Sequence, residues 1–358
     1  MRELNSKTAP KTVRPERIIQ FGEGNFLRAF VDWIISNMNE RSDFNGSVVV
    51  VQPIEKGMVD VLNRQDGLYH VNLQGLENGQ VVNTYRLIDV ISRALNPYSH
   101  FDEYMKLAEQ PEIRFVVSNT TEAGIAFDPA CRLDDRPAVS YPGKLTQLLY
   151  HRFRHFYGDK SKGLIIFPCE LIFQNGHHLK RIIRQYIDLW QLGGDFTAWF
   201  EGACGVYATL VDRIVPGFPR KHIEEIQEKL QYKDQLVVQG EAFHLWVIEA
   251  PESVAQEFPA AECGLNVRFV PDEEPYHRRK VTLLNGPHTL LSPVAYLSGV
   301  DIVREACQDP DVGRYIRKVM FDELIETIDL PREELRTFAD SVMAVSYTHL
   351  TLPTNSLV

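Results

Sequence analysis

Three residues toward the C-terminus have types and spacing that suit proton transfer at an oxygen atom. They are Lys280, Asn285 and His288, in the stretch RRKVTLLNGPH. If residues 280–294 form one helix, Lys280 falls on the stripe that carries Leu284, and Asn285 and His288 lie on the adjoining flank. A lysine among leucines loses hydration, which disfavours its charged form. The pattern therefore suggests a lysine that exchanges its proton beside two hydrogen-bond donors.

A structural interpretation of the same residues stays open at this point. A lysine stem can lie along apolar surface while its ammonium group reaches water, and Asn and His are ordinary on a helix surface. Gly286-Pro287 in the same stretch can also kink the helix and change its facing residues. The choice between the two roles depends on the rest of the chain.

A strand, a glycine turn, a helix and a second strand are predicted near the N-terminus. Residues 17–22 form an apolar run that ends in Gly22-Glu23-Gly24, residues 25–39 have helical periodicity, and residues 47–53 form a continuous apolar strand. This is the opening βαβ unit of a Rossmann-like, doubly wound, mainly parallel sheet. Gly22 and Gly24 stand where a dinucleotide fold needs a tight turn and a close approach of the backbone to a pyrophosphate.

Other residues around this turn are candidate contacts of a dinucleotide. Asn25 and Phe26 begin the helix, and Arg28 lies one helical turn further, where it is either an extra charge for the pyrophosphate or a surface arginine. Leu27 occupies the place of the usual third glycine. At the end of the second strand, Gln52 replaces the acidic residue that usually binds the adenine ribose of NAD. The sequence therefore does not clearly select NAD over NADP.

The fourth strand of the predicted sheet ends in a polar segment. In VVSNTTEAG, Ser118, Asn119, Thr121 and Glu122 follow a buried run. Ligands of doubly wound folds bind at the carboxyl ends of the strands. We expect these four residues to line the nicotinamide site, although a plain polar loop is the alternative.

The remaining elements complete an α/β fold with a helical C-terminal part. A β-hairpin insertion is predicted over 68–89 around the turn Asn78-Gly79. Further strands or strand-like runs lie at 113–119, 163–170, 206–215 and 235–249, and helical periodicity begins near residue 276. We therefore expect a dinucleotide-binding domain over residues 1–275 and the start of a mostly α-helical substrate domain over 276–344.

Composition excludes several classes of function. The formal net charge is −10, which argues against nucleic acid and anionic membranes as partners. The five cysteines form no CxxC pair, and arginines flank the His151 and His155 pair, so we expect no metal site. No apolar leader precedes residue 17, and no run is long enough to span a bilayer. We expect a cytoplasmic protein.

The motifs together resemble the mannitol dehydrogenase family of polyol-specific long-chain dehydrogenases. The K-x4-N-x2-H pattern of that family is matched by Lys280, Asn285 and His288. The uronate-reducing members look most similar, through QFGEGNFLRAFVDW, VVSNTTEAG, YPGKLTQLLYHRF, FPCELIFQNG, LVDRIVPGFPR and EAFHLWVIE. The resemblance covers roughly residues 15–344. The chain departs from a sister branch, the fructuronate reductases, which usually has Cys-Asp-Asn where this chain has Cys169-Glu170-Leu171.

This resemblance implies an NAD-dependent oxidoreductase that reduces a linear keto-uronate to an aldonate without a metal. Lys280 is then the general acid or base, and Asn285 and His288 donate hydrogen bonds to the reacting oxygen. Asn175 is a further candidate for that role, because it lies near Leu171, where the sister branch has an asparagine. A monomer or a weak homo-oligomer is expected. Alternatives are another uronate or polyol dehydrogenase of the family, or a non-catalytic dinucleotide-binding redox sensor.

The last residues do not continue the family pattern. After SVMA the chain reads VSYTHLTLPTNSLV, over 345–358, which looks like translated adapter sequence rather than a native terminus. On this interpretation the helical substrate domain is incomplete. We therefore expect the chain of 358 residues to bind NADH weakly or not at all and to turn over no keto-uronate.

Overall fold

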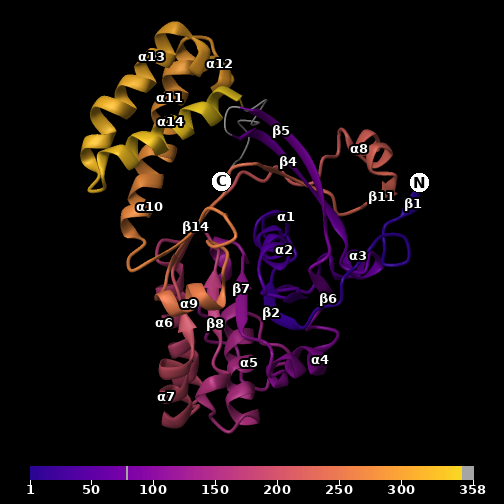
Figure 1. The fold of residues 1–358 in the computed structure, drawn as a ribbon. Coiled ribbons are helices and arrows are strands. Elements are labelled where there is room, and N and C mark those ends of the chain that lie inside the picture. The colour runs from indigo at the N-terminus through magenta and orange to yellow at the C-terminus, as the bar shows by residue number, and fades with distance from the viewer. Residues whose placement is uncertain (78–79, 349–358) are drawn as a thin grey trace. The chain divides into compact units, whose positions relative to one another are not determined.

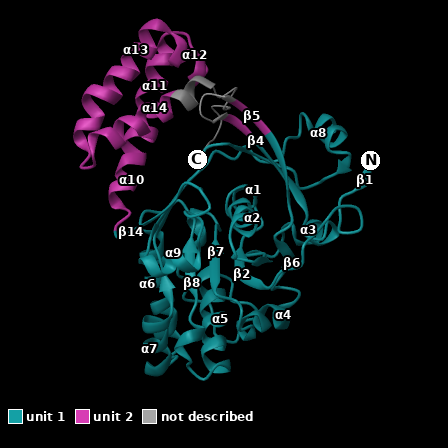
Figure 2. Cartoon of the chain, viewed as in Figure 1, with its two compact units in different colours: residues 1–73, 84–271 teal, residues 74–83, 272–358 magenta. Residues whose placement is uncertain are grey.

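The computed structural model describes residues 1–77 and 80–348, and it divides into two compact units (Figures 1 and 2). Unit 1 comprises residues 1–73 and 84–271, and unit 2 comprises residues 74–83 and those from 272 onward. The boundary expected from the sequence lay after residue 275. The turn Asn78-Gly79 and the end of the suspected tail, 349–358, lie outside the described residues.

A parallel sheet of six strands forms the centre of unit 1, in the order β6-β3-β2-β7-β8-β9. The strands are β2 (Glu16–Phe21), β3 (Ser47–Val51), β6 (Ile91–Leu95), β7 (Phe115–Ser118), β8 (Ile165–Pro168) and β9 (Gly205–Val206). The chain builds outward from β2 to β6, returns to β7 beside β2, and then builds outward on the other side. Doubly wound folds bind their ligands at such a reversal, which here lies at the carboxyl ends of β2 and β7. The predicted Rossmann-like fold is confirmed.

The two faces of the sheet belong to different hydrophobic cores because successive side chains of a strand point to opposite faces. Ile18 and Val48 lie in one core with side chains of α2 (Val31–Arg41). Ile19 and Val49 lie in the other core, with side chains of α5 (Tyr141–His155) and α6 (Asn175–Leu189). Burial on both faces explains why these strands read as continuous apolar runs.

The other helices of unit 1 connect or flank these strands. They are α1 (Asn25–Ala29), α3 (Val59–Arg64), α4 (Phe101–Met105), α7 (Gly194–Ala203), α8 (Ile223–Leu230) and α9 (Glu252–Glu257), with 3-10 turns η1 (Lys106–Glu109), η2 (Glu122–Gly124) and η3 (Lys160–Lys162). The single helix expected over 25–39 is wrong in one respect. Phe30, with φ −117° and ψ −75°, separates α1 from α2.

Apart from Val206, which belongs to β9, the runs expected at 206–215 and 235–249 do not extend the central sheet. They contain β10 (Thr209–Asp212), β12 (Val238–Glu241) and β13 (Leu245–Glu249). β13 pairs with β10 on one side and with β14 (Val267–Val270) on the other. β12 lies beside β4 (Tyr69–Glu77), which forms a long hairpin with β5 (Gln80–Ile88), visible in Figure 1. β1 (Arg2–Glu3) pairs with β11 (Tyr232–Lys233).

Unit 2 is mainly a helical bundle (Figure 2). Its helices are α10 (Glu274–Lys280), α11 (Gly286–Leu297), α12 (Val303–Gln308), α13 (Pro310–Lys318) and α14 (Arg332–Thr348), with the 3-10 turn η6 (Ile325–Thr327). Two π-helical turns, η4 (Val281–Asn285) and η5 (Val319–Leu324), interrupt the α-helical runs. Leu283, Ile316, Met320 and Leu335 are central to its core.

Candidate active site

Gly22 lies at the base of the turn after β2, where no side chain fits. Its φ angle is 121°, a conformation that residues with a side chain rarely adopt. A Cβ atom here would lie 2.8 Å from the carbonyl oxygen of Asn119, just beyond β7. The Gly22 amide donates to the carbonyl of Val51 at 3.1 Å. The turn is therefore held between the ends of β3 and β7, at the base of the crevice.

Gly24 has the opposite environment. Its φ of −66° and ψ of 171° suit any residue, and an added Cβ atom would meet no atom of the described residues within 4 Å. Gly24 is the N-cap of α1, and no side chain of the described residues caps that helix start. Free amides at a helix start attract anions. The open space and the uncapped amides together fit a phosphate group that lies against the turn.

Asn25 and Phe26 begin α1 and pack against other parts of unit 1. A Cβ atom added to Gly217 would lie 2.7 Å from Nδ2 of Asn25, so the loop after β10 reaches the start of α1. The ring of Phe26 stacks on Phe30, with centroids 5.0 Å apart. Both side chains thus help to shape the turn.

Arg28 was expected to offer charge to a pyrophosphate, but its guanidinium is used inside unit 1. The side chain is 1% exposed. Nε donates to the carbonyl of Glu23 at 3.1 Å, Nη1 to that of Leu236, and Nη2 to Oδ1 of Asn25 at 2.8 Å. Burial lowers the pKa of Arg28, and its guanidinium lies over the Tyr69 ring. We therefore reassign Arg28 as a residue that ties the turn to the strands beside it.

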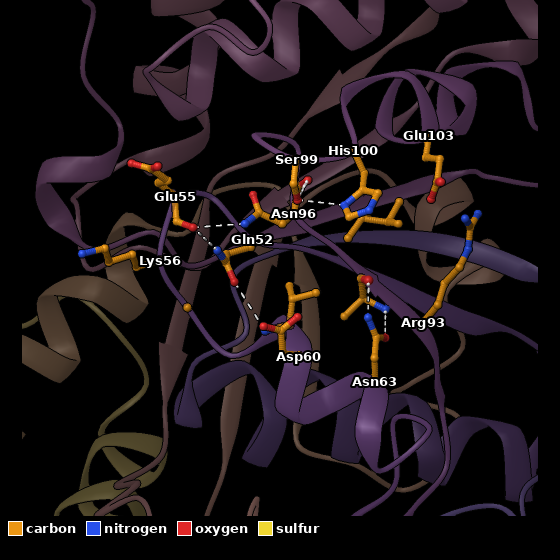
Figure 3. A pocket seen from close by; sticks show the side chains of 14 residues that line it. Gln52, Glu55, Lys56, Asp60, Asn63, Arg93, Asn96, Ser99, His100 and Glu103 are labelled. Carbon is orange, nitrogen blue, oxygen red and sulfur yellow. Dashed lines mark hydrogen bonds between the residues drawn. The ribbon is translucent and has the colours of Figure 1, made fainter.

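The carboxyl end of β3 opens onto a cavity of about 630 Å³ (Figure 3). Gln52 lies in its wall, 2% exposed, and Nε2 donates to the carbonyls of Ile54 and Glu55 at 2.8 and 2.9 Å. Asn96, after β6, donates to the same Glu55 carbonyl at 3.0 Å. Gln52 thus shapes the loop after β3. Glu55 and Lys56 of this loop line the cavity, as do the charged residues Asp60, Arg93 and Glu103.

Glu23, between the two glycines of the turn, is a buried carboxyl group that sequence reasoning did not single out. Oε1 accepts a hydrogen bond from the Met58 amide at 3.4 Å. Burial raises the pKa of Glu23. The side chain turns toward the loop after β3, so it links that loop to the turn. Its place between the glycines was the available signal.

The segment after β7 carries the residues expected at the nicotinamide end. The Asn119 amide donates to the carbonyl of Phe21 at 3.0 Å, and its Nδ2 donates to that of Cys169 at 2.8 Å. Ser118 is fully buried at the end of the strand. Thr121, with φ 76°, is backbone-strained, and Glu122 begins η2; both are exposed. The structure brings Ser118 and Asn119 to the crevice and places Thr121 and Glu122 on the loop that follows.

Thr120 and Glu170 belong to the same cluster and were missed from the sequence. Glu170 follows β8 and is 2% exposed. Oε1 accepts from the amide and the hydroxyl of Thr120 at 2.9 and 3.0 Å, and Oε2 accepts from Ser118 Oγ at 3.1 Å. Burial raises the pKa of Glu170. An acidic residue directly after a buried strand of a parallel sheet was the signal that pointed here.

Asn175 was expected to donate to the reacting oxygen, but its side chain is committed to the backbone. It is 0% exposed, and Nδ2 donates to the carbonyls of Pro168, Glu170 and Thr209, each at 3.0 Å. Oδ1 accepts from the amides of Gly176 and Thr209 at 2.7 and 2.8 Å. With both ends of the amide used, we reassign Asn175 as a link between β8, α6 and β10.

In unit 2, the helical stretch that carries Lys280, Asn285 and His288 is not α-helical throughout. Between α10 and α11 the π-helical turn η4 inserts, and the Gly286 amide bonds to the carbonyl of Val281, five residues back. Residues five apart diverge on an α-helix, whereas a π-helical turn stacks them. Lys280 and Asn285 therefore face one side, and His288, three residues further, continues that side along α11.

The π-helical turn also changes which leucine is buried. Leu284 was expected on the apolar stripe with Lys280, but Leu283 is the leucine that is 0% exposed, and Leu284 is half-buried. Lys280 and His288 are half-buried and Asn285 is exposed. Burial lowers the pKa of His288, so its ring is neutral at pH 7 and carries one N–H donor.

Arg279, next to Lys280, anchors α10 on α14. Its side chain is 3% exposed, and Nη1 lies 2.6 Å from Oε1 of Glu334. The guanidinium lies over the rings of Tyr276 and Phe338, 5.1 and 4.4 Å from their centroids. This packing fixes the rotation of α10 about its axis and hence the direction of Lys280.

Comparison with known families covers both units. Residues 16–261 match the mannitol dehydrogenase Rossmann domain, and residues 272–345 match the mannitol dehydrogenase C-terminal domain. The chain belongs to the mannitol dehydrogenase family. By this membership it is an oxidoreductase.

Curated relatives point to one branch of the family. The altronate oxidoreductase of Phocaeicola vulgatus is 78% identical over 343 residues, which cover 96% of this chain and 72% of that protein. The altronate oxidoreductase of Escherichia coli O7:K1 is 48% identical over 343 residues, which cover 96% and 71%. The suspected resemblance to uronate-reducing members is thereby confirmed.

Solved structures share the fold at low identity. A D-sorbitol dehydrogenase in substrate-free form superposes with a TM-score of 0.80 at 20% identity, over 96% of this chain and 75% of that one. The Pseudomonas fluorescens mannitol 2-dehydrogenase, solved with NAD and D-mannitol, gives 0.73 at 20% identity over 96% and 74%.

In residues 1–77 and 80–348, no helix is long and apolar enough to cross a lipid bilayer. Over the same residues, no group of three or more His, Cys, Asp or Glu side chains is placed to hold a metal ion.

Proposed function

We propose that the enzyme to which this sequence belongs is an NAD-dependent oxidoreductase that reduces tagaturonate to altronate, a step of hexuronate catabolism. The observation that carries the proposal is the name shared by its relatives, altronate oxidoreductase, at 78% and 48% identity over 96% of the chain. The geometry of each unit supports the same chemistry. Unit 1 offers a dinucleotide crevice, and unit 2 offers a lysine with two hydrogen-bond donors on one helical face.

The residues of unit 1 fit NAD in two places. The empty space at Gly24 and the uncapped start of α1 suit the pyrophosphate, with Gly22, Asn25 and Phe26 shaping the turn. The cavity beyond Gln52, about 630 Å³ in volume, suits the adenosine half. A carboxylate at Glu55 favours the 2′-hydroxyl of NAD over the 2′-phosphate of NADP.

The segment after β7 completes the proposed binding site at the nicotinamide end, through Ser118, Asn119, Thr121 and Glu122. When bound, NADH supplies a hydride to the carbon of a ketone. The residues of this chain have to bind and orient the two reactants, exclude water and deliver the proton that the new alkoxide needs.

Lys280 delivers that proton in the proposed mechanism, and takes it back in the reverse direction. Its side chain is half-buried, and the proposed role is that of the general acid for the new alkoxide. Asn285 and the neutral ring of His288 donate hydrogen bonds to the oxygen as its charge develops. The π-helical turn is what directs Lys280 and Asn285 to the same side. Turns of this kind often occur at functional sites.

A substrate panel tests the proposal. Tagaturonate, fructuronate, fructose and fructose 6-phosphate are each assayed with NADH and with NADPH, in this chain and in an extended chain. The extended chain continues residues 1–344 with the part of the Phocaeicola vulgatus relative beyond the matched stretch. In the extended chain, we expect tagaturonate with NADH to give the highest kcat/KM. A preference for fructose, or for NADPH, contradicts the proposed substrate or cofactor.

A further inference from the structure

Glu170 is a buried carboxyl group whose partners are hydrogen-bond donors rather than a cation. Its side chain is 2% exposed. Among the described residues no lysine, arginine or histidine forms an ion pair with it. Instead, it accepts from the Thr120 amide, the Thr120 hydroxyl and the Ser118 hydroxyl at 2.9, 3.0 and 3.1 Å. Burying a carboxylate without a counter-charge costs free energy, so a functional reason for this arrangement is to be sought.

The ionised carboxylate is the form that matches this geometry. A carboxylate accepts only, so all three donors can point to it at once. A protonated carboxyl group carries its own donor, and one of the two hydroxyl groups then has to turn away or accept instead. Ionised Glu170 therefore fixes the direction of the Thr120 hydroxyl proton, and the oxygen of Thr120, which is half-buried, keeps its lone pairs for another partner.

The segment that Glu170 holds also contacts the glycine turn. The Asn119 amide donates to the carbonyl of Phe21 at 3.0 Å. The carbonyl of Asn119 lies 2.8 Å from the place where Gly22 would carry a Cβ atom. Any shift of Ser118–Thr120 is thereby transmitted to the turn after β2. Glu170 supports this segment from β8, on the side away from the turn.

We propose that Glu170 is a positioning residue for the nicotinamide end of the crevice. Its ionised carboxylate holds Ser118–Thr120 in place and makes the Thr120 hydroxyl an acceptor toward the N–H groups of a bound carboxamide. The inference rests on the proposed binding of NAD in this crevice. It assigns a role to a residue that does not itself need to touch the dinucleotide.

The neighbours of Glu170 determine how the cluster responds to pH. Tyr141 on α5 and Cys169 at the end of β8 face it, and burial raises the pKa of both well above their ordinary values, so both are neutral. Burial likewise raises the pKa of Glu170. Its ionised form is therefore lost as the pH falls through that raised pKa, earlier than for an exposed glutamate.

The test compares Glu170→Gln with a matched control. Glutamine keeps the shape of the side chain and can still accept from the Thr120 amide, but it cannot ionise. The control is Glu257→Gln, which also removes a carboxylate. Glu257 pairs at 2.7 Å with Arg114, which precedes β7 at the end of the strand opposite to Ser118. NADH dissociation constants are measured by fluorescence from about pH 5 to about pH 8 in both variants and the parent.

We expect Glu170→Gln to weaken NADH binding about tenfold near pH 8, the effect of one charge-assisted hydrogen bond, and to make it independent of pH. The parent should lose affinity as the pH falls, so that the two curves converge at low pH. Glu257→Gln should follow the parent. In a Thr120→Ala background, the effect of Glu170→Gln should shrink to less than about threefold.

Unfolding of the protein without cofactor gives a second readout. Because the ionised form is the one that burial disfavours, Glu170→Gln should gain stability relative to the parent as the pH rises. A constant ratio of dissociation constants between parent and Glu170→Gln across the pH range overturns the positioning role. Failure of the parent chain and the extended chain to bind NADH at any pH instead overturns the proposed function on which the role rests.

Discussion

The two glycines of the turn after β2 should respond to substitution in opposite ways. At Gly24, valine adopts the observed φ of −66° without strain, and its Cβ atom meets no described atom within 4 Å. At Gly22, alanine would be forced to a φ of 121° with its Cβ atom 2.8 Å from the Asn119 carbonyl oxygen. Gly24→Val should therefore spare the fold and block the ligand, whereas Gly22→Ala should damage the fold.

The magnitudes follow from these environments. Gly24→Val changes an exposed cap position, so the free energy of unfolding should shift by less than about 1 kcal/mol. If the pyrophosphate lies against Gly24, valine displaces it from the free amides of α1. The loss of two charge-assisted hydrogen bonds amounts to roughly 3–6 kcal/mol, or at least about a hundredfold in the NADH dissociation constant. Gly22→Ala should cost about 1–3 kcal/mol in backbone strain alone.

Urea denaturation and NADH titration on the same samples separate the two effects. Gly24→Ala serves as the intermediate step, since its single methyl group probes the same space with less bulk. The expected order of NADH affinity is parent, then Gly24→Ala, then Gly24→Val, at nearly constant urea midpoint. Unchanged NADH affinity in Gly24→Val refutes the assignment of this turn to the pyrophosphate, whatever happens at Gly22.

Three further predictions concern other residues. Lys280→Ala and Lys280→Arg should each abolish keto-uronate turnover in the extended chain, while the NADH dissociation constant stays within about twofold. Alanine has no proton to give, and guanidinium does not release its proton at working pH. A parallel loss of affinity and rate in either variant contradicts this prediction. Asn175→Ala should lower the urea-derived stability by about 3 kcal/mol or more, since it strands buried carbonyls and amides, and full stability with lost turnover would restore its catalytic role. Burial raises the pKa of Asp32 from 3.8 to about 7, so the folded protein binds this proton more tightly than the unfolded chain does. The free energy of unfolding should therefore fall by up to about 4 kcal/mol as the pH rises from about 4 to about 7. Asp32→Asn should remove this dependence, and an unchanged dependence of stability on pH in that variant contradicts the prediction.

Much of the sheet was predictable because its strands are buried on both faces. The apolar runs 17–22 and 47–53, joined through a glycine turn, gave the βαβ unit, and those at 113–119 and 163–170 gave two more parallel strands. The runs at 206–215 and 235–249 look similar, but apart from Val206 their strands pair in smaller sheets. A local hydrophobic pattern indicates that a strand is buried but does not indicate which strand it pairs with. The sequence therefore could not distinguish strands of the central sheet from those of the smaller sheets.

The errors at the site have one physical origin, which is tertiary context. Arg28 and Asn175 have side chains that suit a ligand, yet both are buried and bonded to backbone groups far along the chain. The π-helical turn at Val281–Asn285 also left no periodic signal, because its register depends on packing within unit 2. That register puts Lys280 and Asn285 on one side, whereas the expected α-helix had Asn285 on the flank next to the stripe of Lys280.

Deuteride transfer tests the central claim most directly. The extended chain is incubated with tagaturonate and NADH that carries deuterium at the transferable position, and the product is analysed by NMR and mass spectrometry. We predict altronate with one deuterium atom, bound to the carbon that was the ketone, and no such product with Lys280→Ala. Altronate without deuterium, or labelled product formed equally well by Lys280→Ala, contradicts a hydride transfer that depends on this lysine.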